Sequence, residues 1–236
     1  MSVQFNRAAR IAHGVVALVA LAAVSTSMNI GSWKHSQLPD HVGYAGGFDA
    51  GWEHMANQPA YFTVTSCLLV LIASVAAAVR PAGHVVGRVV GRWGAVFAVV
   101  RIASIGCIAI TGLVFNVLLR DDSPLVGVEW WNDTLAHVVL PVLAPAVWLV
   151  FGPRGEITGR RILASTILPL TWLGATLFRG PLLDWYPYDI LDVPGRGWGV
   201  VGPTVGVILV VYLVVVGVMF AVDRVLASNR LKFKRG

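Results

Sequence analysis

The segment EWWNDTLAHVVLP, residues 129–141, places an aspartate and a histidine at the start of a long apolar run. His137 follows Asp133 by four residues, so on a helix the two side chains lie on one face. A carboxylate in this position can hold an imidazole in one tautomer, and the imidazole can then take a proton from a hydroxyl group. The spacing predicts a general base with its orienting acid. Two simpler interpretations stay open: Asn132 and Asp133 as helix N-cap residues, and His137 as a hydrogen-bonding link between helices.

Thr63, in the segment YFTVTS (61–66), is the candidate nucleophile for this base. A threonine hydroxyl is a weak nucleophile until a neighbouring base removes its proton, and histidine suits that task near neutral pH. The alternative is structural, because a threonine inside a helix usually bonds to a carbonyl one turn back. The catalytic interpretation therefore requires Thr63 and His137 to lie at the same level of neighbouring helices.

Membrane-spanning helices are the elements that must position these residues. The chain has 236 residues, of which 56% are hydrophobic and 13% charged, a balance that a soluble domain does not carry. A bilayer core of roughly 30 Å requires about 20 apolar residues per helix. Segments of about this length are 11–30, 61–79, 96–119, 134–151, 162–178 and 199–222. We expect an all-α membrane protein in which residues 1–236 form one bundle of six transmembrane helices.

The distribution of Lys and Arg predicts the orientation of this bundle. Most of these residues lie in the terminal segments and in the second and fourth loops: Arg7, Arg10, Arg80, Arg88, Arg92, Arg154, Arg160, Arg161, Arg224, Arg230, Lys232, Lys234 and Arg235. The other loops carry only Lys34, Arg120, Arg179 and Arg196. The positive-inside rule then places both termini in the cytoplasm. Because Arg exceeds Lys and Ala and Val are abundant, as in high-GC bacteria, we expect a multi-pass protein of a bacterial plasma membrane.

This orientation gives each polar residue a depth. At about 1.5 Å per residue, Thr63 lies roughly 6 Å, Asp133 about 5 Å and His137 about 10 Å below the outer ends of their spans. Other polar and aromatic residues are expected at the same level: Asn116 at the end of the third span, and Arg179, Trp185, Tyr186 and Tyr188 in the segment LFRGPLLDWYPYDILD (177–192). We expect one outer-leaflet pocket in which these five residues bind substrate. Asn116, Arg179, Tyr186 or a loop amide would stabilise an oxyanion there.

Other chemistry is not indicated by the sequence. Cys67 and Cys107 lie inside predicted spans, where a thiol is an ordinary packing residue. The first outer loop has three histidines, His35, His41 and His54, but their spacing matches no familiar metal site. The net charge of +6 is scattered over loops, which argues against a nucleic-acid partner. We expect no cofactor and no metal, and the bilayer and a lipid substrate as partners.

Arg101 is a charged residue inside the third predicted span. Its side chain would either snorkel to the interface or pair within the bundle.

Four segments resemble the bacterial branch of the androgen-induced gene 1 family, whose animal members include the androgen-dependent TFPI-regulating protein. They are YFTVTS (61–66), TGLVFNVLLR (111–120), WWNDTLAHVVLP (130–141) and LFRGPLLDWYPYDILD (177–192). The resemblance implies a six-span membrane enzyme in which a threonine and a histidine, here Thr63 and His137, hydrolyse fatty acid esters of hydroxy fatty acids. Two features depart from the family. Asp133 stands where animal members tend to have Asn, and YPYDILD replaces the commoner YPYPFLD.

The leading prediction is therefore an integral-membrane lipid ester hydrolase, with Thr63 as nucleophile, His137 as base and Asp133 as the orienting acid. The alternative is a transporter or lipid-binding protein that uses the same pocket without hydrolysis, with His137 titrating. Against a transporter, the six spans show no internal repeat and no pair of broken helices at the midplane. A third possibility is a scaffold whose site has lost activity.

Overall fold

The computed structural model describes residues 7–36, 46–79, 89–120 and 124–233. Within these ranges the secondary structure is helical and includes no strand. Six helices are long and apolar enough to cross a membrane: Arg7–Trp33, Phe62–Val79, Gly94–Leu119, Gly127–Phe151, Gly159–Leu183 and Trp198–Ser228. The prediction of an all-helical chain with six potential membrane spans is confirmed.

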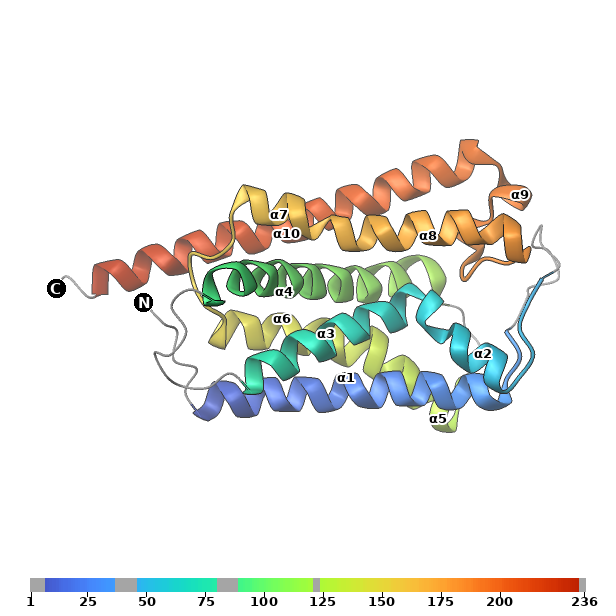
Figure 1. Ribbon diagram of the computed structural model, residues 1–236, viewed down its shortest axis with the longest axis horizontal. Helices are drawn as coiled ribbons and strands as arrows, with labels where there is room; N and C mark the ends of the chain where they lie inside the picture. The colour runs from blue at the N-terminus through green and yellow to red at the C-terminus, as the bar shows by residue number, and fades with distance from the viewer. Residues whose placement is uncertain (1–6, 37–45, 80–88, 121–123, 234–236) are drawn as a thin grey trace.

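Helix α4 (Val89–Val114) occupies the centre of the bundle (Figure 1). On one side it packs against α3 (Phe62–Val79) and α6 (Leu140–Phe151), which in turn contact α1 (Arg7–Trp33). On the other side lie α7 (Gly159–Ser165), α8 (Ile167–Leu183) and α10 (Trp198–Phe233). Helices α8 and α10 make few close backbone contacts with each other.

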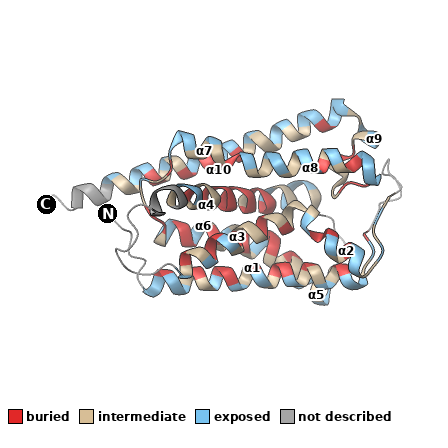
Figure 2. Ribbon diagram, viewed as in Figure 1, coloured by how far each residue is buried: buried red, intermediate tan, exposed pale blue. Residues whose placement is uncertain are grey.

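The outer surface of the bundle is apolar along its length, as a lipid-facing surface should be. Side chains such as Leu18, Ile72, Val142 and Val214 are more than half exposed, which would be an aggregation hazard in water but costs nothing in hydrocarbon. Figure 2 shows that the buried positions follow α4 and the faces of its neighbours. The interior therefore holds the polar groups that need hydrogen-bond partners.

The two ends of the bundle differ in their covering elements. One end carries α2 (Trp52–Asn57), η1 (Gln58–Ala60), η4 (Asp189–Leu191) and α9 (Val193–Arg196), and we call it the capped end (Figure 1). Helix α1 begins and α10 ends at the opposite end.

Two ionic residues hold the loop 152–158 at that opposite end. Arg101 is buried and donates to Glu156 of this loop at 2.7 Å, so its charge is paired by a carboxylate at this end of the bundle. Asp223 accepts hydrogen bonds from the backbone N–H groups of Gly155 and Ile157. These bonds fix the turn that leads from α6 into α7.

The fourth span begins earlier than the sequence predicts. Helix α5 (Gly127–Thr134) has Val126 as its N-cap, so the N-cap interpretation of Asn132 and Asp133 is wrong. Gly127 is the first residue of α5 and has a φ of 57°. Glycine adopts this left-handed conformation without strain. Asn132 instead directs its amide at Ala23, Thr26 and Ser27 of α1. The polar start of this span is thus tied to a neighbouring helix.

Two π-helical turns face each other at the capped end. Turn η2 (Phe115–Leu119) ends the third span, and turn η3 (Leu135–Val139) joins α5 to α6. The amide of Asn116 bridges them, donating to the carbonyls of Gly112 at 2.6 Å and His137 at 2.9 Å. Single π-helical turns inside α-helices occur frequently at functional sites. Here both turns adjoin the residues that the sequence singles out.

Candidate active site

The structure brings Thr63, His137 and Asp133 into one hydrogen-bonded chain. The Oγ1 atom of Thr63 lies 3.2 Å from Nε2 of His137, and Nδ1 of His137 lies 2.9 Å from Oδ1 of Asp133. Because a carboxylate only accepts, Nδ1 carries the hydrogen and Nε2 is left to accept from the hydroxyl. His137 and Asp133 are each 8% exposed. The order hydroxyl, imidazole, carboxylate is that of a catalytic triad.

Arg120 completes the environment of the carboxylate. Its Nη2 donates to Oδ2 of Asp133 at 3.0 Å, so each carboxylate oxygen has one partner. Its Nε donates to Oδ1 of Asn116 at 2.9 Å. From the sequence, Arg120 was predicted only as a positive charge in a loop. Arg120 follows Asn116 by four residues, the same spacing as Asp133 and His137. This repeated spacing was the feature of the sequence that could have identified Arg120 as a site residue.

Phe115 fixes the plane of the imidazole. Its ring stacks on His137 with the centroids 3.5 Å apart and an angle of 3° between the planes. The guanidinium of Arg120 lies over the same phenyl ring, 5.1 Å from its centroid. With one nitrogen held by Asp133 and one face covered by Phe115, the imidazole presents Nε2 to Thr63 in a single orientation. Phe115 was not among the residues predicted from the sequence.

Asn116 and Arg179 are not placed to stabilise an oxyanion. The Nδ2 group of Asn116 donates to the carbonyls of Gly112 in α4 and His137 in η3, and Arg179 donates to Oδ1 of Asn57 at 2.9 Å. Asn116 therefore positions the backbone of His137, and Arg179 lies in a separate groove.

Tyr188 is the predicted loop residue that reaches the nucleophile. Its hydroxyl lies 3.4 Å from Oγ1 of Thr63 and accepts from the backbone N–H of Thr63 at 3.3 Å. This amide belongs to the first turn of α3, where N–H groups have no partner within the helix. Burial raises the pKa of the Tyr188 phenol, so the group stays protonated and can donate. Tyr188 is thus the side chain best placed to donate to a substrate oxygen beside Thr63.

Trp185 and Tyr186 support the loop and do not line the cavity at Thr63. Both are buried. Trp185 packs edge-on against Phe48 and Tyr61. The ring of Tyr186 lies against Gly180, where a Cβ would come within 2.2 Å of it. Their role is to hold the backbone that presents Tyr188.

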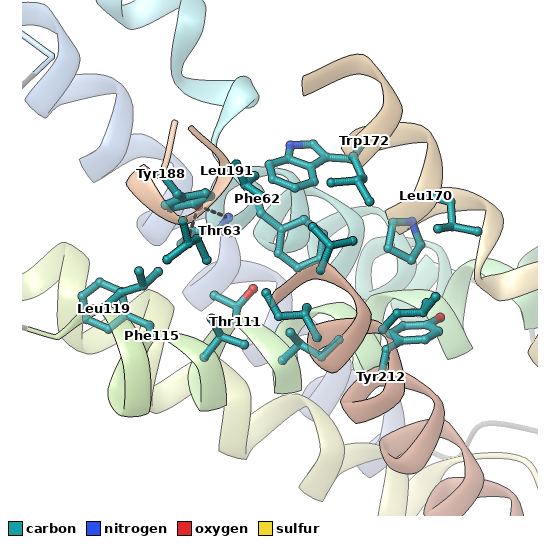
Figure 3. A pocket seen from close by; sticks show the side chains of 18 residues that line it. Phe62, Thr63, Thr111, Phe115, Leu119, Leu170, Trp172, Tyr188, Leu191 and Tyr212 are labelled. Carbon is teal, nitrogen blue, oxygen red and sulfur yellow. Dashed lines mark hydrogen bonds between the residues drawn. The ribbon is translucent and has the colours of Figure 1, made fainter. Parts of the chain in front are cut away.

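An apolar cavity leads away from Thr63 into the bundle (Figure 3). Its volume is about 790 Å³, including space open to the surroundings. Thr63 and Tyr188 lie at one end, and Leu170 and Tyr212 at the other. The walls come from α3, α4, η2, η4, α8 and α10, and most of the lining is apolar: Phe62, Ile110, Val114, Phe115, Leu119, Pro169, Leu170, Trp172, Leu173, Ile190, Leu191, Val205, Ile208 and Leu209.

His137 is absent from the cavity wall, so the cavity meets the triad at Thr63. At the far end, the Tyr212 hydroxyl donates to Ser165 at 2.8 Å and is not free for a ligand. The shape and lining suit an extended hydrocarbon chain that carries one polar group at Thr63.

No protein-family model, curated protein or solved structure matches the chain. The resemblance to the androgen-induced gene 1 family therefore rests on the four motifs alone. The arrangement of Thr63, His137, Asp133 and Tyr188 is an observation that does not depend on any relative.

The described residues include no group of three or more His, Cys, Asp or Glu side chains that could hold a metal ion. His54 is buried and bonds to the Lys34 carbonyl and to Gln58, whereas His35 lies beside Asp49. His41 lies outside the described residues. Cys67 and Cys107 are buried free thiols.

Proposed function

We propose that the protein is an integral-membrane lipid ester hydrolase with Thr63 as its nucleophile. One observation carries the proposal: a threonine hydroxyl lies within hydrogen-bond distance of an imidazole that a buried carboxylate orients, at the mouth of an apolar cavity. A packing threonine needs neither the oriented base nor the cavity. The resemblance to the androgen-induced gene 1 family favours fatty-acyl esters, such as fatty acid esters of hydroxy fatty acids, as substrates.

The reaction follows from the positions of these groups. The Oγ1 atom of Thr63 attacks the ester carbonyl while its proton passes to Nε2 of His137, and Tyr188 donates to the oxyanion that forms. When this tetrahedral intermediate collapses, the imidazolium gives its proton to the departing alcohol oxygen. A water molecule, deprotonated by His137, then attacks the acyl-threonine. Collapse releases the fatty acid and restores the Thr63 hydroxyl.

The charge distribution supports a location for this chemistry. We infer that both termini are cytoplasmic, that the capped end faces outward from a bacterial plasma membrane, and that the substrate comes from the outer leaflet. The space between α8 and α10, which both line the cavity, offers an acyl chain a lateral route from the lipid.

A covalent probe tests the nucleophile directly. Purified protein in nonionic detergent is treated with a fluorophosphonate, and the modified residue is located by peptide mass spectrometry. We expect labelling at Thr63, together with release of fatty acid from acyl esters by the untreated protein. Labelling elsewhere would exclude Thr63 as the nucleophile. Protein that retains acyl esters without labelling or turnover would favour the lipid-binding alternative.

Enlarging a side chain in the far part of the cavity should change the preferred acyl length. Leu209 lines the cavity on α10, and Leu209→Trp fills space that a long chain would occupy. We expect kcat/KM for a C16 acyl ester to fall about tenfold relative to a C8 ester, because the displaced methylenes lose their burial. Leu213→Trp is the matched control, since Leu213 is 43% exposed on the same helix and does not line the cavity. An unchanged C16 to C8 ratio in Leu209→Trp would place the acyl chain elsewhere.

Crowding the contact between the third and fourth spans should lower kcat. A Cβ on Gly112 would lie 2.5 Å from Cβ of Pro141 and 3.3 Å from the His137 carbonyl oxygen. Gly112→Ala should therefore push η3 away and move the imidazole from Thr63, with a loss in kcat of about tenfold. In the control Gly174→Ala, the added Cβ meets nothing within 4 Å. Full kcat in a correctly folded Gly112→Ala variant would contradict this account of η3.

A further inference from the structure

A second hollow opens at the capped end beside the apolar cavity. Its lining residues come from α2, η1 and α8: Ala56, Asn57, Pro59, Ala60, Trp172, Ala175, Thr176 and Arg179. The space measures about 610 Å³, including its open part. We call it the Arg179 groove. Trp172 lines both hollows, and its indole N–H donates to the Ala60 carbonyl at 3.0 Å. The groove is therefore next to the cavity but separated from it by an anchored side chain.

Arg179 differs from the other described basic side chains at the capped end. Lys34 pairs with Glu129, Arg120 with Asp133 and Arg196 with Asp189. For Arg179 the part of the chain that the structure describes supplies no carboxylate, and its recorded partner is the neutral amide oxygen of Asn57. A guanidinium has five N–H donors in a planar fork. The hydrogen bond recorded among the described residues uses one of these donors.

Two neutral polar side chains line the groove together with Arg179. Asn57 is 6% exposed, and its Nδ2 has no acceptor among the described residues. Thr176 adds a hydroxyl, and no Asp or Glu lines the described wall. A partly buried guanidinium beside neutral polar groups, with no acid on the described wall, suits a carboxylate or a phosphate.

The surroundings indicate that the anion belongs to a lipid. On α8, which carries Arg179, Phe178 is 72% exposed and Leu182 is 70% exposed. Such side chains suit contact with hydrocarbon at the end of a membrane helix. An anion bound at Arg179 would therefore have its apolar chain beside an apolar surface.

We propose that the Arg179 groove binds the anionic group, a carboxylate or a phosphate, of a lipid molecule. The guanidinium pairs with the anionic oxygens, and Asn57 holds the guanidinium in position. This site requires no ester cleavage, so it stands independently of the hydrolase proposal.

Binding of radiolabelled oleate tests the site in the full-length Thr63→Ala protein, in nonionic detergent, so that turnover plays no part. Arg179→Gln should weaken oleate binding about tenfold or more and leave oleyl alcohol, which has the same chain without the charge, unchanged. Arg179→Lys should retain most of the affinity. Arg196→Gln is the control, because it removes a charge at the same end outside the groove.

Salt gives a second measurement that needs no substitution. Raising NaCl from 50 to 500 mM should weaken binding of oleate to the Thr63→Ala protein but not of oleyl alcohol. Equal oleate affinity with and without the Arg179 charge would overturn the site. Inorganic phosphate that competes with oleate at equal affinity would overturn its assignment to lipid.

Discussion

Replacing Thr63 with alanine is expected to lower kcat for ester hydrolysis by about four orders of magnitude or more and to abolish fluorophosphonate labelling. The substitution removes the only hydroxyl that the described structure holds against Nε2 of His137, at 3.2 Å, so no acyl-enzyme can form. Thr63→Ser keeps the hydroxyl and should retain activity within about tenfold. The measurement is single-turnover acyl release by purified protein, with the thermal midpoint in detergent as a check on folding.

Two further variants make this result specific. His137→Ala should cost about as much as Thr63→Ala, and the double variant should be no slower than either, because groups that act as one unit are not additive. Thr65→Ala is the matched control. Thr65 lies two residues after Thr63 on α3, its hydroxyl donates to the Pro59 carbonyl at 2.7 Å, and it does not line the cavity. Losses that multiply in the double variant would mean that the two residues act independently.

The hydropathy of the sequence was sufficient to predict the six long helices but not where the fourth one starts. Glu129, Asn132 and Asp133 lower the hydropathy before Thr134, so the predicted span began there, whereas the helix begins at Gly127. The polar residues are accommodated by partners on other elements. Lys34 pairs with Glu129, and Arg120 pairs with Asp133. Such long-range pairs are not visible in a window of local hydropathy.

The centre of the site was predictable because residues four apart are neighbours on a helix, and Asp133 and His137 stay in contact although His137 lies in η3. The i,i+4 spacing placed Asp133 against His137, and equal depth placed Thr63 opposite. The stacking of Phe115 and the bonds made by Asn116 depend on two π-helical turns. A periodicity of 3.6 residues does not predict such turns.

The sequence predicts one common role, substrate binding, for the residues of the segment 177–192. In the structure these residues have different roles. Trp185 and Tyr186 are buried supports, Arg179 lies in its own groove, and Tyr188 contacts Thr63. Their side-chain directions depend on the loop backbone, including Asp184 with a φ of 48°. A non-glycine residue rarely adopts this conformation, and no pattern in the sequence indicated it.

Replacing Tyr188 with phenylalanine is expected to lower kcat by about 10²–10³-fold, the usual cost of removing one oxyanion donor. The sequence predicts Tyr188 only as a substrate-binding residue, but its phenol lies 3.4 Å from Oγ1 of Thr63 and is held by the Thr63 backbone N–H. Burial raises its pKa, so it stays protonated as the pH rises past the ordinary range of a phenol. KM should change little, because the donor acts mainly on charge that develops in the transition state.

Tyr61→Phe provides the control for this prediction. Tyr61 packs edge-on against Tyr188, but its hydroxyl lies 3.5 Å from Nε2 of His54. Tyr61 does not line the cavity. Loss of kcat in both variants would mean that the loop needs its hydroxyl groups for folding rather than for catalysis. Loss in Tyr188→Phe alone, with an unchanged thermal midpoint and KM, would identify the phenol as the oxyanion donor.

Fluorophosphonate labelling of Tyr188→Phe should still occur at Thr63, only more slowly, because the nucleophile and its base are intact. A variant that labels at the wild-type rate and hydrolyses at the wild-type rate would leave the α3 N-terminal amides as the remaining donors at this position.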